Sequence, residues 1–242
     1  MLKTSLPKPI TISKIVKENY RTKTFITDVP INGLPGQFIM VWFPGIGEKP
    51  FSLTDIKPLT FTVMKVGQFT SHLVDNLKTG QKLGWRGPFG KGVFTSQPGK
   101  KVLIAGGCGC VPLYFLAKTL MTKKNTSVII GAKNKQELLF IDRFKRLGFP
   151  VITTTDDGSL GYKGFTTDRL EELVRNGKID TVYACGPMVM LEKIWHICQK
   201  FGIKYQLSLE AMMKCGFGVC GSCSINGKLV CQDGPVFNRW PK

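Results

Sequence analysis

Four cysteines lie close together near the C-terminal end of the chain, in a segment rich in glycine. Cys215, Cys220, Cys223 and Cys231 are spaced C-x4-C-x2-C-x7-C. The first three match the run of plant-type ferredoxins, in which one loop supplies three thiolates and a more distant cysteine completes the set. Intervening glycines permit positive φ and let backbone amides approach the sulfides. The spacing predicts a [2Fe-2S] centre on these four cysteines.

Two other uses of the same cysteines compete with this prediction. A structural zinc site usually has two C-x2-C or C-x4-C knuckles well apart in the chain, whereas here three ligands share one loop. Disulfides are typical of secreted proteins, and the first ten residues, MLKTSLPKPI, lack the apolar core of a signal peptide. The spacing therefore favours iron-sulfur over zinc and over thiols of another kind, and leaves both alternatives open.

The composition limits the class of protein. A chain of 242 residues can hold two compact domains and a small appendage. It has no run of about 18 apolar residues, so we expect a cytoplasmic protein without a membrane span. The 34 Lys and Arg against 16 Asp and Glu give a net charge of +18. Because these cations are scattered, a solvated basic surface is favoured; an acidic partner or a phosphate-bearing cofactor comes second, and nucleic acid is not expected.

The N-terminal part, residues 1–97, shows the pattern of a small antiparallel β-barrel. Short β-branched or alternating runs are separated by Pro and Gly turns. Only residues 70–77 have helical spacing. The predicted strands are residues 10–18, 22–26, 37–43, 51–55, 59–66 and 81–85.

Residues 49–53, KPFSL, place a cation, a rigid turn, an aromatic ring and a hydroxyl in a row at a predicted strand start. An isoalloxazine ring could use such a row, because it needs a flat apolar face, a hydroxyl at its polar edge and a positive charge. An ordinary strand start after a proline turn explains the same residues. Residues 87–92, GPFGKG, indicate only a loop.

From residue 101 the pattern changes to alternating strands and helices. The apolar run at 102–107 ends in Gly106 and Gly107, Gly109 follows in the same turn, and Pro112 then suits the first turn of a helix. Such a turn lets the backbone approach a pyrophosphate at the helix N-terminus, although it is not a strict G-x-G-x-x-G. The turn predicts a nucleotide site.

Further alternation predicts a doubly wound parallel sheet with helices on both faces. Cys185, Gly186, Pro187 and Met188 follow the fourth strand of this sheet, so both glycine turns should face one crevice at its carboxyl edge. The further predicted strands are 127–131, 150–154, 181–184 and 204–208; the helices are 113–120, 135–147, 167–174 and 189–200.

Other residues carry weaker signals. Cys185 would lie where a nicotinamide meets a flavin, but simple packing explains it equally well. Cys108, Cys110 and Cys198 are expected to pack in the fold. His72 and His196 have no ligating partner one helical turn away, so structural roles are expected.

The order of barrel, nucleotide-binding sheet and cysteine loop resembles the ferredoxin-reductase superfamily. Within it, nearly the whole chain is similar to the electron-transfer subunits of dihydroorotate dehydrogenase B. The segments that carry the resemblance are KPFSL at 49–53, GPFGKG at 87–92, AGGCGCVPL at 105–113, YACGPMVML at 183–191, SLEAMMKCGFGVCGSC at 208–223 and VCQDGPVF at 230–237.

The resemblance implies three modules and a partner. It implies FAD on residues 1–97, NAD on 98–207 and the [2Fe-2S] cluster on 208–242. In pyrimidine biosynthesis an FMN-containing catalytic subunit would oxidise dihydroorotate. Electrons would pass through the cluster and FAD to NAD⁺, in a heterotetramer with two copies of each subunit.

The resemblance also implies residue roles. Ser52 would contact the polar edge of the flavin ring, and Cys185 would lie on the nicotinamide side. The other implied FAD residues are Lys49, Pro50, Phe51, Leu53, Val63, Met64, Lys65, Phe69 and Thr70. The implied NAD residues are Gly106, Gly107, Gly109, Pro112, Cys185, Gly186, Pro187 and Met188.

Several positions depart from the family pattern. Lys49 stands where the family usually has Arg, which replaces a bidentate phosphate contact with a point charge. Phe69 replaces a Gly, and the seven-residue gap before Cys231 is short. Lys133 leaves NADP open. The alternatives are a gamma-type subunit of a soluble hydrogenase or of a ferredoxin:NADP reductase complex, and a zinc-stabilised nucleotide-binding module without redox activity.

Overall fold

The structure is a computed structural model that describes residues 6–177 and 179–241. The chain divides into two compact units. One contains the residues up to Val93 together with Ala211–Pro235, and the other contains Phe94–Glu210 and the residues from Val236 onward. The cysteine segment therefore belongs to the same unit as the N-terminal strands. In the described part of the chain, every helix is too short or too polar to cross a membrane.

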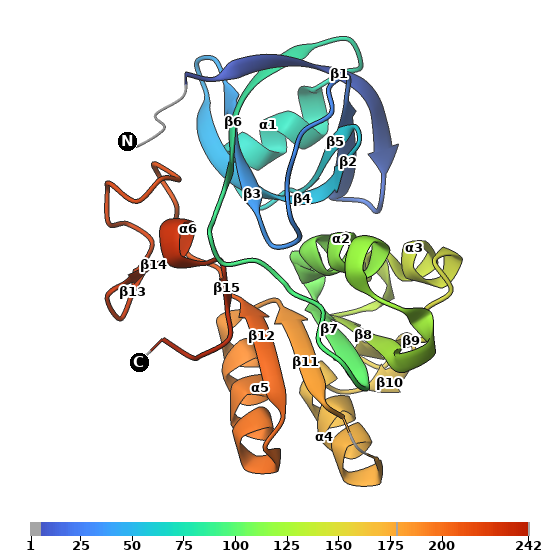
Figure 1. The fold of residues 1–242 in the computed structure, drawn as a ribbon. Helices are drawn as coiled ribbons and strands as arrows, with labels where there is room; N and C mark the ends of the chain where they lie inside the picture. Colours follow the sequence, from blue (N-terminus) through green and yellow to red (C-terminus); the bar gives the residue numbers. More distant parts are fainter. Residues whose placement is uncertain (1–5, 178, 242) are drawn as a thin grey trace. The chain divides into compact units, whose positions relative to one another are not determined.

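The first unit is built on a closed six-stranded barrel, as predicted (Figure 1). Neighbouring strands are antiparallel, and the order around the barrel is β1-β2-β5-β4-β3-β6. The strands are β1 (Lys8–Lys17), β2 (Thr22–Thr27), β3 (Phe38–Phe43), β4 (Gly47–Ile56), β5 (Leu59–Met64) and β6 (Lys82–Phe89).

The barrel interior is filled by large apolar side chains. Phe25 and Phe61 are fully buried, and their ring centroids lie 5.5 Å apart. Helix α1 (Gln68–Asn76) buries Phe69, Leu73 and Val74, which occur at the spacing of one helical face. Strand alternation and this helical stripe together produce one apolar core.

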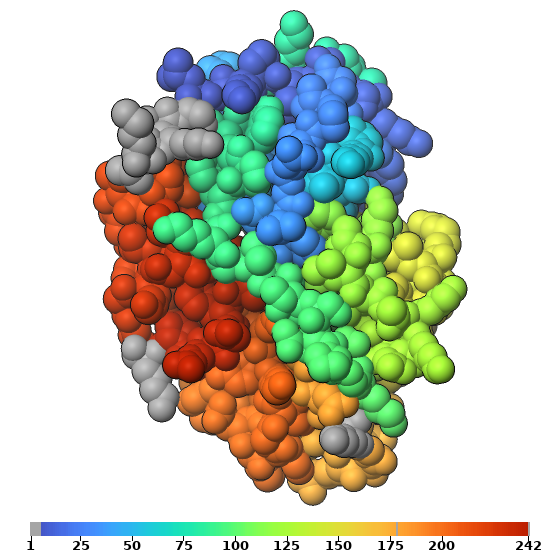
Figure 2. Space-filling model, in the orientation of Figure 1, coloured from blue at the N-terminus to red at the C-terminus, as the bar shows by residue number. Residues whose placement is uncertain are grey.

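The cysteine segment adds short elements to this unit. They are β13 (Ser224–Ile225), β14 (Lys228–Leu229) and helix α6 (Val230–Asp233). The Lys91 amide donates to the Gln232 carbonyl at 3.2 Å, and the Gly92 amide donates to the Gly234 carbonyl at 2.9 Å. In the space-filling view the orange-to-red segment lies against the chain that leaves β6 (Figure 2).

The second unit contains a seven-stranded sheet in the order β10-β9-β8-β7-β11-β12-β15. All strands are parallel except β15, which runs antiparallel to β12. The strands are β7 (Lys101–Gly106), β8 (Thr126–Ala132), β9 (Val151–Thr155), β10 (Tyr162–Lys163), β11 (Thr181–Cys185), β12 (Lys204–Ser208) and β15 (Val236–Phe237).

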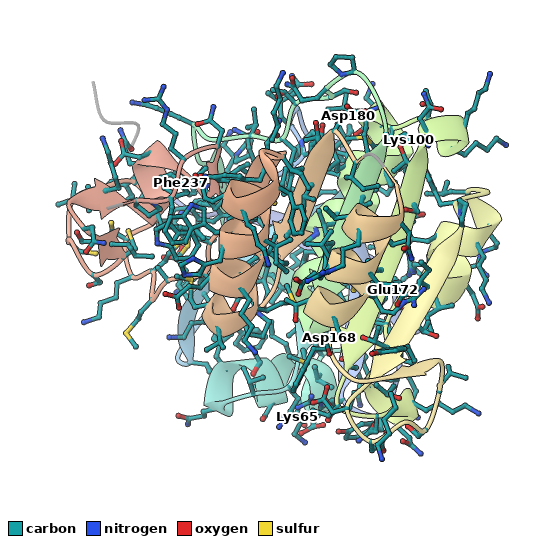
Figure 3. The ribbon with its side chains drawn as sticks, turned by 90° about the horizontal axis from the view of Figure 1, so that it is seen from below. Lys65, Lys100, Asp168, Glu172, Asp180 and Phe237 are labelled. Carbon is teal, nitrogen blue, oxygen red and sulfur yellow. The ribbon has the colours of Figure 1, made fainter. Side chains whose placement is uncertain are left out.

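Four α-helices connect these strands. Right-handed crossovers place α2 (Cys110–Leu120) and α3 (Ile141–Arg146) on one face of the sheet. They place α4 (Thr166–Asn176) and α5 (Met188–Phe201) on the other. The predicted doubly wound sheet is thereby confirmed. At the edge where the strands begin, the Lys100 amide donates to Asp180 Oδ2 at 2.8 Å (Figure 3).

The helix predicted at 135–147 is confirmed only in its second half, because residues 135–140 do not form an α-helix. The structure has a 3-10 turn, η3 (Lys135–Glu137), an irregular stretch, and then α3. The Asn134 side chain accepts from the Glu137 amide at 3.1 Å and closes this first turn. Leu138, Leu139 and Phe140 are all buried, and Phe140 adopts a φ of 64°, a left-handed conformation that a right-handed helix cannot contain.

Smaller differences concern short elements. The predicted strand start at residues 49–53 is wrong, because β4 begins at Gly47 and these residues lie inside it. The two-residue strands β10, β13, β14 and β15 and the four-residue helix α6 were not predicted from the sequence. Two to four residues give no periodic pattern to detect.

Candidate functional site

The four predicted cluster ligands come together on the cysteine segment as two pairs. Cys223 Sγ and Cys231 Sγ lie 3.3 Å apart, far beyond a disulfide bond of about 2.05 Å. The Cys215 and Cys220 side chains lie within hydrogen-bonding range of each other. All eight cysteines are free thiols. The segment therefore presents four cysteines without disulfide bonds, arranged as two pairs of neighbouring side chains.

The pairing fits two metal ions better than one. With Zn–S bonds of about 2.3 Å, a tetrahedral zinc needs its four sulfurs all about 3.8 Å apart. The structure instead gives a close contact within each pair, Cys223 with Cys231 and Cys215 with Cys220. Two sulfurs on each iron is the arrangement that a [2Fe-2S] centre requires. The donor set therefore fits the cluster.

Backbone amides of the loop point at the sulfurs. The Val219 amide donates to Cys215 Sγ at 3.4 Å, and the Cys231 amide donates to Cys223 Sγ at 3.5 Å. Gly216 and Gly218 have φ values of 82° and 87°, which turn the chain around the ligands. Such hydrogen bonds stabilise bound thiolates.

The thiol pKa values follow these surroundings. Hydrogen bonds from the Ser222 side chain and amide lower the pKa of exposed Cys220 to about 6. Burial alone would raise the pKa of Cys215, but amide donors outweigh it and the pKa is lowered. Burial and the neighbouring Cys223 raise the pKa of Cys231 to about 12. A thiolate at Cys231 needs nearby positive charge, which iron supplies.

The predicted flavin row lies on β4, where side chains alternate between two faces. Lys49 and Phe51 point to one face, and Pro50 and Ser52 point to the other. The Phe51 ring lies 5.7 Å from that of Phe61. One face of β4 thus offers a cation and an aromatic ring, whereas the hydroxyl lies on the opposite face.

The remaining predicted flavin residues are on β5 and α1. Val63 and Phe69 are buried, whereas Lys65 is exposed and pairs with Asp75 at 2.6 Å. The Thr70 hydroxyl accepts from the Val66 and Gly67 amides at 2.9 and 3.0 Å and so caps α1. Buried Leu53 and half-buried Met64 complete the set.

The predicted nucleotide turn joins β7 to α2. A Cβ added to Gly109 would lie 1.9 Å from the Cys185 carbonyl oxygen, so only glycine fits there. A Cβ on Gly107, whose φ is 53°, would meet nothing within 4 Å. Helix α2 begins without a side-chain cap, and buried Pro112 lies in its first turn. The backbone at Gly107 is open to an approaching phosphate.

The second glycine turn meets the first at the carboxyl edge of the sheet. Cys185 ends β11, and its register partner on β7 is Ala105. A Cβ on Gly186 would lie 3.0 Å from Gly106 Cα. Pro187 precedes α5, which starts at Met188. The structure thus brings both predicted turns together.

Cys185 is buried beside two residues that sequence reasoning missed. Burial raises the pKa of its thiol, the negative charge of Glu210 raises it further, and a hydrogen bond with Ser208 lowers it. Partial desolvation also raises the pKa of Glu210, although its side chain still reaches solvent. Glu210 lies two residues after the end of β12 at Ser208, so an acidic residue close behind a predicted sheet strand was the available signal.

The other cysteines pack in the fold as expected, and both histidines contact aromatic rings. Cys110 and Cys198 are buried, and half-buried Cys108 packs against the core of the second unit. The His72 ring lies 4.6 Å from that of Phe43, and the His196 ring lies 4.5 Å from that of Trp195.

Two family models match the chain. Residues 210–240 match the iron-sulfur cluster binding domain of dihydroorotate dehydrogenase B, and residues 103–195 match the oxidoreductase NAD-binding domain. The first match covers all four paired cysteines, and the second covers both glycine turns. The barrel, the sheet and the cysteine loop define an oxidoreductase subunit of the ferredoxin-reductase class.

Relatives narrow this class to one family. A probable dihydroorotate dehydrogenase B (NAD(+)) electron transfer subunit of Methanocaldococcus jannaschii is 41% identical, covering 96% of this chain and 90% of the relative. The similarly described protein of Pyrococcus furiosus is 48% identical, covering 89% and 84%. The chain belongs to the family of dihydroorotate dehydrogenase B electron transfer subunits.

Solved structures agree with the fold. An NADH-dependent reduced ferredoxin-NADP oxidoreductase, studied for flavin-based electron bifurcation, superposes with a TM-score of 0.84 at 31% identity. The match covers 98% of this chain and 89% of that one. Phthalate dioxygenase reductase has a TM-score of 0.69 at 15% identity, covering 90% and 85%, and shows the fold alone.

Proposed function

We propose that the chain carries electrons from an FMN-containing catalytic subunit, which oxidises dihydroorotate to orotate, to NAD⁺ in pyrimidine biosynthesis. Its cofactors are a [2Fe-2S] cluster, FAD and NAD. The observation that carries the proposal is the pairing of four free thiols on a loop that belongs to the barrel unit. A barrel and a nucleotide-binding sheet in the same chain supply the other two modules.

The division of labour follows from electron counting. When bound, a flavin links hydride transfer, which moves two electrons, to the single-electron transfer of an iron-sulfur centre. The protein's part is to hold these groups. Cys215, Cys220, Cys223 and Cys231 would bind the irons, and loop amides would stabilise the thiolates.

The residue assignments for FAD remain part of the proposal. Lys49 and Phe51 are suited to the phosphate and ring of FAD because both are at least partly accessible on one face of β4. Ser52 would act from the opposite face. Pro50, Leu53, Val63, Met64, Lys65, Phe69 and Thr70 would shape the surrounding barrel surface.

The assignments for NAD concern the carboxyl edge of the sheet. Gly107 would approach the pyrophosphate, while Gly106 and Gly109 hold the two turns in contact. Cys185, with its raised pKa, would meet the nicotinamide as a neutral thiol. We assign FAD to residues 1–97, NAD to 98–207 and the cluster to 208–242.

A catalytic partner follows from the family's description as an electron transfer subunit. We propose a heterotetramer with two copies of each subunit and, as predicted from the sequence, a cytoplasmic location.

The test is purification from native extract under anaerobic conditions, followed by a dihydroorotate-dependent NAD⁺ reduction assay. We expect an FMN protein to copurify and NADH to form. Copurification with a different oxidoreductase, without activity on dihydroorotate, would contradict the proposal.

A second candidate is an electron-transfer subunit of a complex that exchanges electrons between ferredoxin and NADP. The specific support is the likeness to the NADH-dependent reduced ferredoxin-NADP oxidoreductase over 98% of the chain. The same purification separates the two candidates, because NADPH-dependent ferredoxin reduction by the isolated complex would favour the second.

A further inference from the structure

Arg86, on β6 of the barrel, is held by a carboxylate from another strand. Its Nε donates to Glu48 Oε1 at 2.8 Å, and its Nη2 donates to Glu48 Oε2 at 2.5 Å. The two side chains are only 10% and 18% exposed. A bidentate pair that is this well shielded fixes the plane of the guanidinium.

The same guanidinium reaches the cysteine loop. Arg86 Nη2 donates to the backbone carbonyl of Cys215 at 3.2 Å, across 129 residues of sequence. Its Cζ lies 5.4 Å from the ring centroid of Phe217 and 5.8 Å from that of Phe89. Arg86 therefore contacts the first predicted iron ligand's backbone and an aromatic residue two positions later.

The turn between these contacts also packs closely on the barrel. A Cβ on Gly216, whose φ is 82°, would lie 2.8 Å from Met40 Cγ on β3. The first ligand turn is thus held from β3 through Met40 and from β6 through Arg86. A cation-π contact and a charge-assisted hydrogen bond are both strengthened when they are shielded from solvent.

We propose that Arg86 is a positioning residue that fixes the first ligand turn of the iron-sulfur loop on the barrel. The inference rests on the proposed function, because it concerns the placement of the cluster relative to a flavin bound by the barrel. Glu48 acts through Arg86, because its carboxylate holds the guanidinium in the orientation that contacts the loop.

The arrangement also has an electrostatic consequence. A reduced cluster carries one more negative charge than an oxidised one, and net charge and hydrogen bonds set cluster potentials. The Arg86 cation at the Cys215 carbonyl favours the reduced form, and the Glu48 anion opposes it. Removing the Arg86 charge should therefore lower the midpoint potential, whereas removing the Glu48 charge should raise it.

The experiment compares wild-type holoprotein with Arg86→Met, Arg86→Lys and Glu48→Gln. Arg175→Met is the control, because it removes an arginine of an exposed pair on α4 in the other unit. Readouts are iron and sulfide content, the paramagnetic resonance spectrum of the reduced cluster, its midpoint potential, and hydrogen exchange over residues 212–222.

Arg86→Met should lower the midpoint potential, and Glu48→Gln should raise it. Arg86→Lys keeps the charge but loses the fork, so it should nearly restore the potential. Its paramagnetic resonance lines should be broader than those of wild type, and its loop amides should exchange about tenfold faster than in wild type. The control should match wild type in every readout.

Two results together would overturn the proposal, even if Arg86→Met failed to fold. They are hydrogen exchange in the Arg86→Lys loop as slow as in wild type, and a midpoint potential in Glu48→Gln equal to that of wild type. This outcome leaves the proposed function intact, because wild type would still contain its cluster. Wild-type protein without iron would instead refute the proposed function.

Discussion

At the scale of single residues, the ligand assignment depends on Cys220. It is exposed, and the Ser222 hydrogen bonds keep its pKa near 6, so a thiolate is available for metal near neutral pH. We expect Cys220→Ser to abolish the paramagnetic resonance signal of the cluster and to leave FAD bound. Cys198→Ala, which changes a buried cysteine of α5, should retain both. Loss of FAD and cluster together in Cys220→Ser would contradict separate sites.

Glu210 predicts a pH dependence of stability. Burial raises its pKa above the ordinary value of 4.5, so the folded chain binds this proton more tightly than the unfolded chain. The free energy of unfolding of the wild type, compared with that of Glu210→Gln, is therefore most favourable at low pH. That advantage is lost as pH rises from about 4.5 through the raised pKa.

The measurement is the unfolding temperature of both proteins between pH 5 and pH 8. We expect the glutamine variant to gain on the wild type as the pH rises, until the pH exceeds the raised pKa and the difference becomes constant. An equal difference at every pH would mean that Glu210 ionises as readily in the folded chain as in the unfolded one.

Residue types and spacing identified the four cysteines and both glycine turns, because these signals are local in the sequence. Arg86 and Glu210 could not be found in the same way. Arg86 is 129 residues from Cys215, and only the folded barrel brings them together. The importance of Glu210 comes from its position close to buried Cys185, which spacing does not reveal.

At the scale of elements, the β7–α2 turn requires glycine at two positions for two different physical reasons. Gly109 has a φ of −58°, which any residue adopts, but a Cβ there would overlap the Cys185 carbonyl oxygen. Gly107 has open space, but a φ of 53°. We expect Gly109→Ala to cost about 3 kcal/mol or more through overpacking, and Gly107→Ala about 1–2 kcal/mol through backbone strain.

Thermal unfolding and flavin reduction by NADH would check this ranking. Gly109→Ala should lose stability and NADH-driven reduction together, because it separates the two turns. A Gly107→Ala variant less stable than Gly109→Ala would show that the turns do not interlock as described.

Strands were predicted better than short helices for a physical reason. The buried parallel strands β7 and β8 contain short continuous apolar runs bounded by glycine, which are typical of buried parallel strands. Residues 138–140 are also apolar, but tertiary packing buries all three and no helix continues through them. Local pattern cannot distinguish these two outcomes.

At the scale of the whole molecule, the basic composition predicts how fast the chain associates with its partner. A net charge of +18 should speed association with an acidic catalytic subunit and make the rate depend on salt. We expect the association rate, measured by stopped flow, to fall about tenfold or more between 20 and 300 mM salt. A rate independent of salt would indicate that the basic surface is only solvated.

The central claim is that four thiols hold two irons in a chain that also binds a flavin. Paramagnetic resonance on anaerobically prepared, dithionite-reduced protein tests it most directly, with iron, sulfide and flavin counted in the same sample. The account predicts a [2Fe-2S] signal with two irons, two sulfides and one FAD per chain. A colourless protein that contains one zinc and gives no signal would contradict it.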